Sequence, residues 1–106
     1  MPKYLVIASY TNDGIKGVLK TGGTARTKAV KEAVEGLGGS LESFYFAFGK
    51  DDAYVTIDMP DDASAAALAM AVAATGLVGI RVVVLLTPGD IDDATKKSVA
   101  FTPPGK

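Results

Sequence analysis

Five side chains in the sequence have the chemical types that proton transfer or the orientation of a polar ligand requires. They are Tyr10, Tyr45, Tyr54, Asp58 and Arg81. A buried carboxylate close to tyrosines and an arginine can act as a general base or hold a small polar ligand. We therefore interpret all five as ligand-binding candidates, and all except Tyr10 as catalytic candidates. The simpler alternative is a subunit interface with one Asp–Arg pair, because interfaces are enriched in tyrosine and arginine.

A second candidate is an anion site at the start of a predicted helix. Gly22, Gly23 and Thr24 precede that helix, and the cations Lys20 and Arg26 lie nearby in the sequence. Backbone N–H groups at a helix N-terminus bind anions. A phosphate-binding P-loop is excluded, because Gly23 stands where that motif requires lysine. The alternative is a loop whose glycines only shape the first turn of the helix.

Metal and cofactor sites find little support in the composition. The chain has neither cysteine nor histidine, which removes thiolate zinc sites, histidine-ligated haem and Ser-His or Cys-His nucleophiles. Its acidic cluster is Asp51, Asp52, Asp58, Asp61 and Asp62. No spacing in that cluster matches a calcium loop, and turn or helix-cap roles explain most of its members. We expect no metal and no cofactor.

Length and charge indicate one globular domain without nucleic-acid or membrane partners. The chain has 106 residues, of which 48% are hydrophobic, and a formal net charge of −1. There is no basic stripe for nucleic acid. The uncharged run 63–80 is alanine-rich and interrupted by Gly76 and Gly79, so a membrane span is rejected. The start of the chain lacks signal-peptide features, and we expect a cytoplasmic protein.

The spacing of apolar residues predicts the elements that position these candidates. Period-2 alternation predicts strands at 3–10, 41–48, 53–59 and 80–86, and helical spacing or capping signals predict helices at 24–36, 61–75 and 88–97. Residues 14–23 are expected to hold at most a short helical turn. The order is that of an α+β, ferredoxin-like βαββαβ domain, with an antiparallel sheet, helices on one face and a short C-terminal helix. We assign residues 1–98 to this domain and 99–106 to an extended tail.

Strand alternation divides the side chains between a helix-covered face and an open face of the sheet. The residues expected to face the helices are Val55, Ile57, Val82, Val84 and Leu86. Those expected on the open face are Tyr54, Thr56, Asp58, Arg81, Val83 and Leu85, joined by Ser43 and Tyr45, which share a strand face with Leu41, and by Tyr4 and Tyr10. A solvated face would not usually carry this many apolar and aromatic groups. We therefore expect a dimer or higher homo-oligomer.

Segments throughout the sequence resemble the GYD domain family of small bacterial proteins. The resemblance covers roughly residues 3–97 and rests on YLVIASYTNDGIKGVLK, GGTAR, LGGSLESFYFAFGKDDAYVTIDMPD and VVVLLTP. It implies a ferredoxin-like fold and face-to-face dimers of the dimeric α+β barrel group. Gly49 and Asp52 match the name-giving motif, whereas Asp51 stands where the family has tyrosine. Asp58 likewise stands where a glutamate is more typical.

Three functions follow from these observations. The first is a small oligomeric ligand-binding or accessory protein, with a modest pocket between paired sheets. The second is a cofactor-free monooxygenase or isomerase acting on a small aromatic-like substrate, in which Tyr45, Tyr54 and Asp58 position or deprotonate the substrate and Arg81 holds an oxyanion. The third is a purely structural oligomer in which the helix 61–75, uncharged after Asp62, packs against further subunits.

Overall fold

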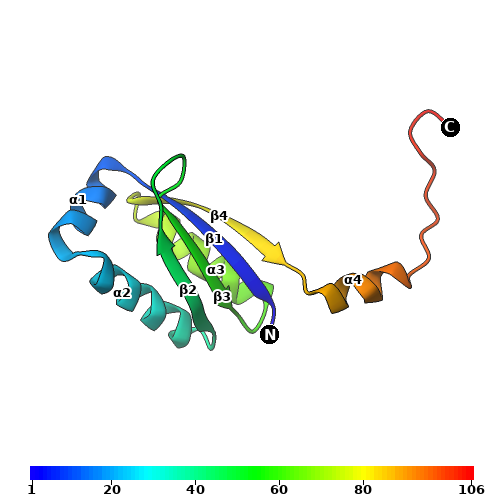
Figure 1. The fold of residues 1–106 in the computed structure, drawn as a ribbon, viewed down its shortest axis with the longest axis horizontal. Helices are drawn as coiled ribbons and strands as arrows, with labels where there is room; N and C mark the ends of the chain where they lie inside the picture. Colours follow the sequence, from blue (N-terminus) through cyan, green and yellow to red (C-terminus); the bar gives the residue numbers. More distant parts are fainter.

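The computed structural model describes residues 1–106 and has the α+β architecture that the sequence predicts (Figure 1). Its elements are β1 (Lys3–Tyr10), α1 (Asn12–Thr21), α2 (Gly23–Gly36), β2 (Ser40–Phe46), β3 (Ala53–Asp58), α3 (Asp62–Ala74), β4 (Val78–Leu85) and α4 (Pro88–Thr95). The four strands form one antiparallel sheet in the order β2-β3-β1-β4. This arrangement is consistent with a ferredoxin-like fold.

The first crossover contains a complete helix that the sequence interpretation reduced to a short turn. Helix α1 has ten residues, and the Thr11 side chain caps it by accepting a hydrogen bond from the Gly14 N–H at 3.2 Å. A Cβ atom at Gly14 would lie 2.0 Å from the Leu77 carbonyl oxygen, so glycine is needed for α1 to approach the start of β4. The glycines of α1 lower its helix propensity and interrupt the helical spacing of its apolar residues, so the sequence does not indicate a helix. Contacts with the rest of the fold outweigh this low propensity.

Side-chain caps fix the starts of the two later helices. Asp61 accepts a hydrogen bond from the Ser64 N–H at 2.8 Å, which lowers the pKa of its carboxyl group. At α4, Thr87 and Asp90 form a reciprocal capping box, which confirms the predicted start of this helix. The Tyr4 hydroxyl donates a hydrogen bond to Asp62, which ties the first turn of α3 to β1 and raises the pKa of Tyr4 to about 12.

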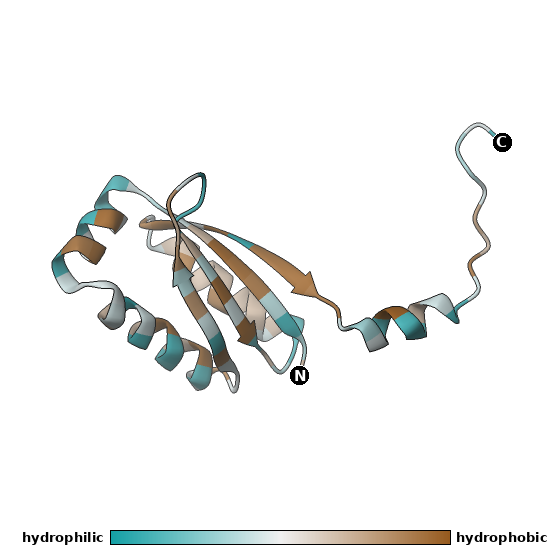
Figure 2. Cartoon of the chain, viewed as in Figure 1, coloured by the Kyte–Doolittle hydropathy of each residue, from teal (hydrophilic) through white to brown (hydrophobic).

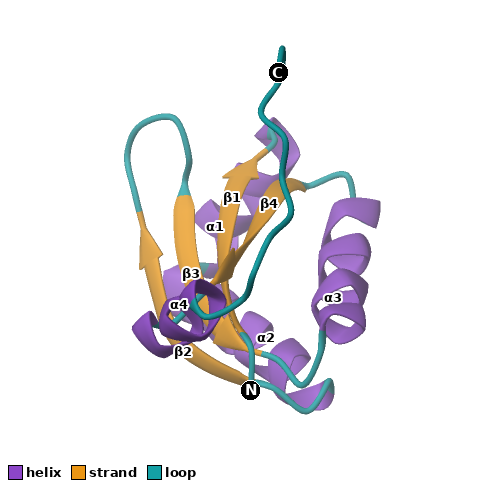
Figure 3. Ribbon diagram, turned by 90° about the vertical axis from the view of Figure 1, so that its right-hand side faces the viewer, coloured by secondary structure: helices purple, strands orange, loops and turns teal.

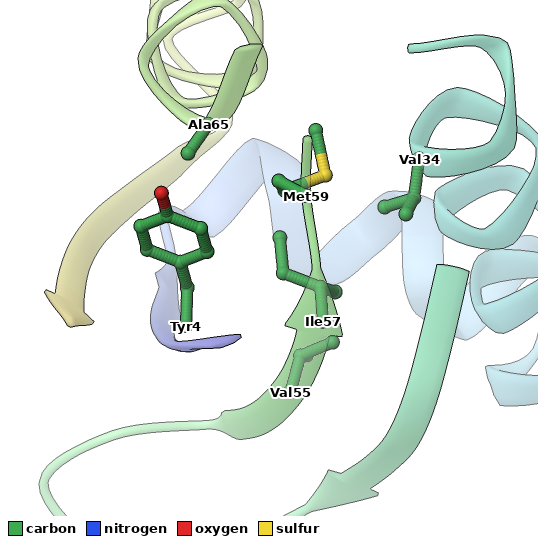
Figure 4. Close-up of a cluster of buried hydrophobic side chains, with 6 residues drawn as sticks. All are labelled: Tyr4, Val34, Val55, Ile57, Met59 and Ala65. Carbon is green, nitrogen blue, oxygen red and sulfur yellow. The ribbon is translucent and has the colours of Figure 1, made fainter. Parts of the chain in front are cut away.

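The hydrophobic core lies between the sheet and the helices (Figure 4). Its larger cluster of buried side chains consists of Tyr4, Val34, Val55, Ile57, Met59 and Ala65, and a smaller one of Ala8, Ala53 and Val78. Tyr4 is paired in register with Ile57 and Val84 and is only 2% exposed. The helix-facing assignment of Val55, Ile57, Val82 and Val84 is therefore confirmed. The placement of Tyr4 on the open face is wrong, because cross-strand partners share a face and its partners are helix-facing.

Strand β2 departs from strict alternation. A register shift between Leu41 and Ser43 puts Leu41 opposite Ile57, where it packs against the core. Ser43 and Tyr45 remain on the open face, opposite Thr56 and Tyr54. The prediction that Leu41 joins them is wrong, because the bulge inserts one residue and exchanges the faces on either side of it.

The C-terminal segment extends away from the body of the molecule. Figures 1 and 2 show α4 and the tail projecting beyond the end of β4. All residues from Leu86 to Lys106 are exposed, including the apolar Ile91, Val99 and Phe101. No helix in the chain combines the length and apolar character needed to span a bilayer.

Candidate functional site

The open face of the sheet does not gather the predicted carboxylate and arginine. Asp58 pairs instead with Lys3 at 3.1 Å. Arg81 lies opposite Ile7 across β1, whereas Asp58 lies opposite Lys3, so the two are four residues apart along that strand. This spacing corresponds to about 13 Å. The predicted pairing of Asp58 with Arg81 is therefore wrong, because each residue has another partner.

Arg81 has a different acidic partner, on the loop between β2 and β3. One of its guanidinium nitrogens donates to Asp51 at 3.1 Å, and the Ser9 hydroxyl donates to the same carboxylate at 3.0 Å. Asp51 is 9% exposed. The neighbouring Asp52 carboxylate accepts from the Tyr10 N–H at 2.8 Å, so the two acids together attach this loop to β1. Their arrangement is that of a structural anchor.

The tyrosine candidates are divided between the two faces. Tyr45 and Tyr54 are cross-strand neighbours on the open face, where they are 71% and 39% exposed. Tyr10 lies on the other side, because it is paired with Val78 and lines the space beneath the helices. Its predicted place beside Tyr45 and Tyr54 is wrong, since it belongs to the Tyr4 side of the strand alternation.

The residues of the predicted anion site at the start of α2 lie in different surroundings. Gly22 precedes the helix with a positive φ of 86° and supplies no side-chain cap, and Gly23 and Thr24 open the first turn of the helix. Lys20 is exposed on α1. Arg26 instead lines the space between α2 and the sheet. Arg26 is therefore part of the lining of that space, whereas the exposed Lys20 is not.

The space between α2, α3 and the sheet is a cavity of about 130 Å³. Helix α2 packs over β2 and α3 packs over β4, which are the two outer strands of the sheet (Figure 3). The cavity lies between these helices, over the central strands. Of the 14 residues that line the cavity, 13 are hydrophobic. Val6, Val55 and Ile80 contribute from the sheet, Ala29, Val30 and Ala33 from α2, and Leu68 and Val72 from α3. The alanine side chains of α2 are too short to fill the gap.

Arg26 is the only charged residue in the lining of the cavity. Its Nε atom is buried and has no hydrogen-bond partner, and the side chain takes part in none of the ion pairs in the structure. A buried donor without a partner costs about 1–3 kcal/mol. Arg26 therefore places a cation without a protein partner in the lining of an otherwise apolar space.

The cavity adjoins a wider, more polar groove of about 410 Å³ between α1, α2 and α3. Tyr10 and Arg26 are the only residues with polar side chains that line both spaces. Asp13, Thr21 and Thr75 also line the groove. The site consequently has an apolar interior and a polar mouth with Arg26 at the junction.

Sequence reasoning missed this cavity, although one signal for it is present in the sequence. Arg26 precedes Ala29, Val30 and Ala33 by three, four and seven positions, which places it within the apolar stripe of α2. An arginine at such a position must reach water, find a partner, or face a ligand. The interpretation of Arg26 as part of an exposed anion loop overlooked that spacing.

Comparison with known proteins identifies the family of the chain. A search of curated proteins and of solved structures gives no match. The family model described as the GYD domain matches residues 4–95 and confirms the resemblance seen in the sequence. Apart from Lys3, the matched region includes all four strands and α1 to α4, with both Asp51 and Arg26. This chain therefore belongs to the GYD domain family.

Proposed function

We propose that this protein binds a small apolar molecule in the cavity between α2, α3 and the sheet. The observation that carries the proposal is the lining, in which 13 of 14 residues are hydrophobic. Ligand sites are typically concave and mostly apolar, with a few polar groups that fix the orientation of the ligand. The site lies on the helix side of the sheet, away from the paired-sheet pocket that the sequence suggested.

The size of the cavity limits the ligand. Its volume of about 130 Å³ is close to that of an engineered apolar cavity of about 150 Å³ that stays dry and binds benzene. A single aromatic ring or a short branched alkyl group is therefore the size class that fits.

The contacts of the candidate residues on the open face do not favour catalysis there. A general base must lie within hydrogen-bond reach of the proton it removes. Asp58 is occupied by Lys3, and Arg81 by Asp51, so neither charged group is free beside Tyr45 and Tyr54. We therefore place ligand binding ahead of the cofactor-free oxygenase or isomerase.

The test is benzene binding to variants in which the cavity is filled. At ten times its Kd, benzene should stabilise the native protein by about 1.4 kcal/mol, which raises the Tm by several degrees. Ala33→Leu and Ala29→Leu extend side chains into the cavity and should abolish this shift. Ala25→Leu is the matched control, because Ala25 is exposed on the same helix and lines neither space. The proposal fails if benzene gives no shift in the wild type, or an equal shift in all three variants.

We also infer that two copies pair through their open faces. Leu5 and Val83 give this face an apolar centre, and Leu85 lies beside Lys3 at one end. The pairs Lys3–Asp58 and Arg81–Asp51 place both signs of charge toward the two ends. A face of this kind is self-complementary under a twofold axis. The net charge of −1 offers little repulsion between copies.

A further inference from the structure

We propose that the ligand is a small carboxylic acid whose apolar part fills the cavity and whose carboxylate binds Arg26. This inference rests on the proposed function and adds the chemical class of the ligand. It follows from the position of one cation, the composition of the mouth of the cavity and the charge of the groove beyond it.

Arg26 has no acidic partner within the protein. Its Nε–H is buried without an acceptor, and no carboxylate of the chain forms an ion pair with it. The other arginine, Arg81, is paired with Asp51, so the absence of a partner is specific to Arg26. The guanidinium group presents its donors in a planar fork that matches a carboxylate. A ligand carboxylate would supply the acceptor that the protein lacks.

The apolar cavity and the polar groove share a boundary. Arg26 and Tyr10 stand where the apolar cavity meets the polar groove. A molecule with its ring among Val55, Val72 and Ile80 would therefore place its substituent beside these two side chains. The two ends of the site differ in polarity as the two ends of an aromatic or branched aliphatic acid do.

The charges that line the groove favour a carboxylate over a more highly charged anion. Asp13 is the other charged residue that lines the groove, and it is acidic. A negative side chain at the mouth opposes a doubly charged phosphate more strongly than a singly charged carboxylate. One accessible arginine balances one negative charge, which favours the carboxylate.

The experiment compares benzoate with benzamide, which has nearly the same shape and no charge. Calorimetric titration at pH 7 should give benzoate at least a tenfold lower Kd than benzamide. Arg26→Met keeps much of the apolar stem and should reduce the ratio to about one, while benzamide still binds. Arg26→Lys keeps the charge without the planar fork and should give an intermediate ratio. Lys16→Met is the control for charge loss, because Lys16 is exposed on α1 and lines neither space.

The outcomes separate this inference from the proposed function. If benzene and benzamide bind and benzoate binds no more tightly, the carboxylate inference is overturned and the apolar binding site stands. If none of the three binds, both proposals fail. A benzoate preference that survives in Arg26→Met, or that disappears in Lys16→Met, also overturns the role of Arg26. Circular dichroism of each variant establishes that it is folded before its Kd is compared.

Discussion

The two faces of the sheet differ in whether their charged side chains have partners within the chain. On the open face, Arg81 is paired with Asp51 and Asp58 with Lys3, while apolar residues occupy the centre. The helix-covered face holds the hydrophobic core and one charged side chain without a partner, Arg26. Paired charges at the margin of a surface satisfy one another, whereas an unpaired buried donor leaves an unmet interaction. The unmet interaction is therefore the better indicator of a ligand site.

The faces also differ in how completely they are packed. Around Tyr4, Ile57 and Met59 the covered face is closed, with each side chain at most 2% exposed. A short distance along the same face, the alanines of α2 leave a cavity. The open face has no covering element within the chain, and Val83 is 40% exposed there. Truncating side chains on each face should measure this contrast.

The largest effect is expected at the closed part of the covered face. Ile57→Ala removes a side chain that is 1% exposed and should lower the free energy of unfolding by about 2–5 kcal/mol. Val83→Ala on the open face should cost less than about 1 kcal/mol in the monomer, because that residue is already partly solvated. Urea denaturation followed by circular dichroism at low protein concentration gives both values. Equal losses would show that the two faces are packed alike.

Much of this contrast was predictable from the sequence. Alternation identified Val55, Ile57, Val82 and Val84 as helix-facing, and the capping signals at Asp61 and Thr87 located the starts of two helices. These features are local, since each depends on residues a few positions apart. The order of the elements was then sufficient to identify the ferredoxin-like arrangement.

The remaining features depend on contacts between distant segments. The bulge after Leu41 exchanges the faces of β2, and Gly14 of α1 is required by the carbonyl group of Leu77, just before β4. Arg81 takes Asp51 as its partner because the loop between β2 and β3 bends back onto β1. No local spacing reports such contacts. The cavity is harder still to predict, because it depends on how far apart α2 and α3 lie.

A charge at the centre of the open face should test its proposed pairing with a second copy. Val83 lies opposite Leu5, which in turn lies opposite Thr56. Val83→Lys would bring two ammonium groups into the apolar centre of a twofold interface, at a cost of several kcal/mol. Sedimentation velocity at micromolar concentration should show a dimer for the wild type and a folded monomer for the variant. Leu19→Lys is the control, because Leu19 is 80% exposed on α1, away from this face. A wild-type monomer, or an unchanged dimer in Val83→Lys, would contradict the pairing.

The smallest effect is a dependence of stability on pH at the junction of β1 and α3. The hydrogen bond from the Tyr4 hydroxyl to Asp62 raises the pKa of Tyr4 to about 12, above the value near 10 of an unfolded chain. A group whose pKa is raised on folding stabilises the native state fully below its unfolded pKa, and that contribution declines as the pH rises from about 10 to 12. Tyr4→Phe should therefore be less stable than the wild type at pH 7, and the difference should narrow through this range. Tyr45→Phe is the matched control, because its ring is 71% exposed and its hydroxyl makes no hydrogen bond within the chain. Thermal unfolding from pH 7 to 12 measures the difference, and a constant gap between wild type and Tyr4→Phe would show that the Asp62 hydrogen bond does not govern the titration of Tyr4.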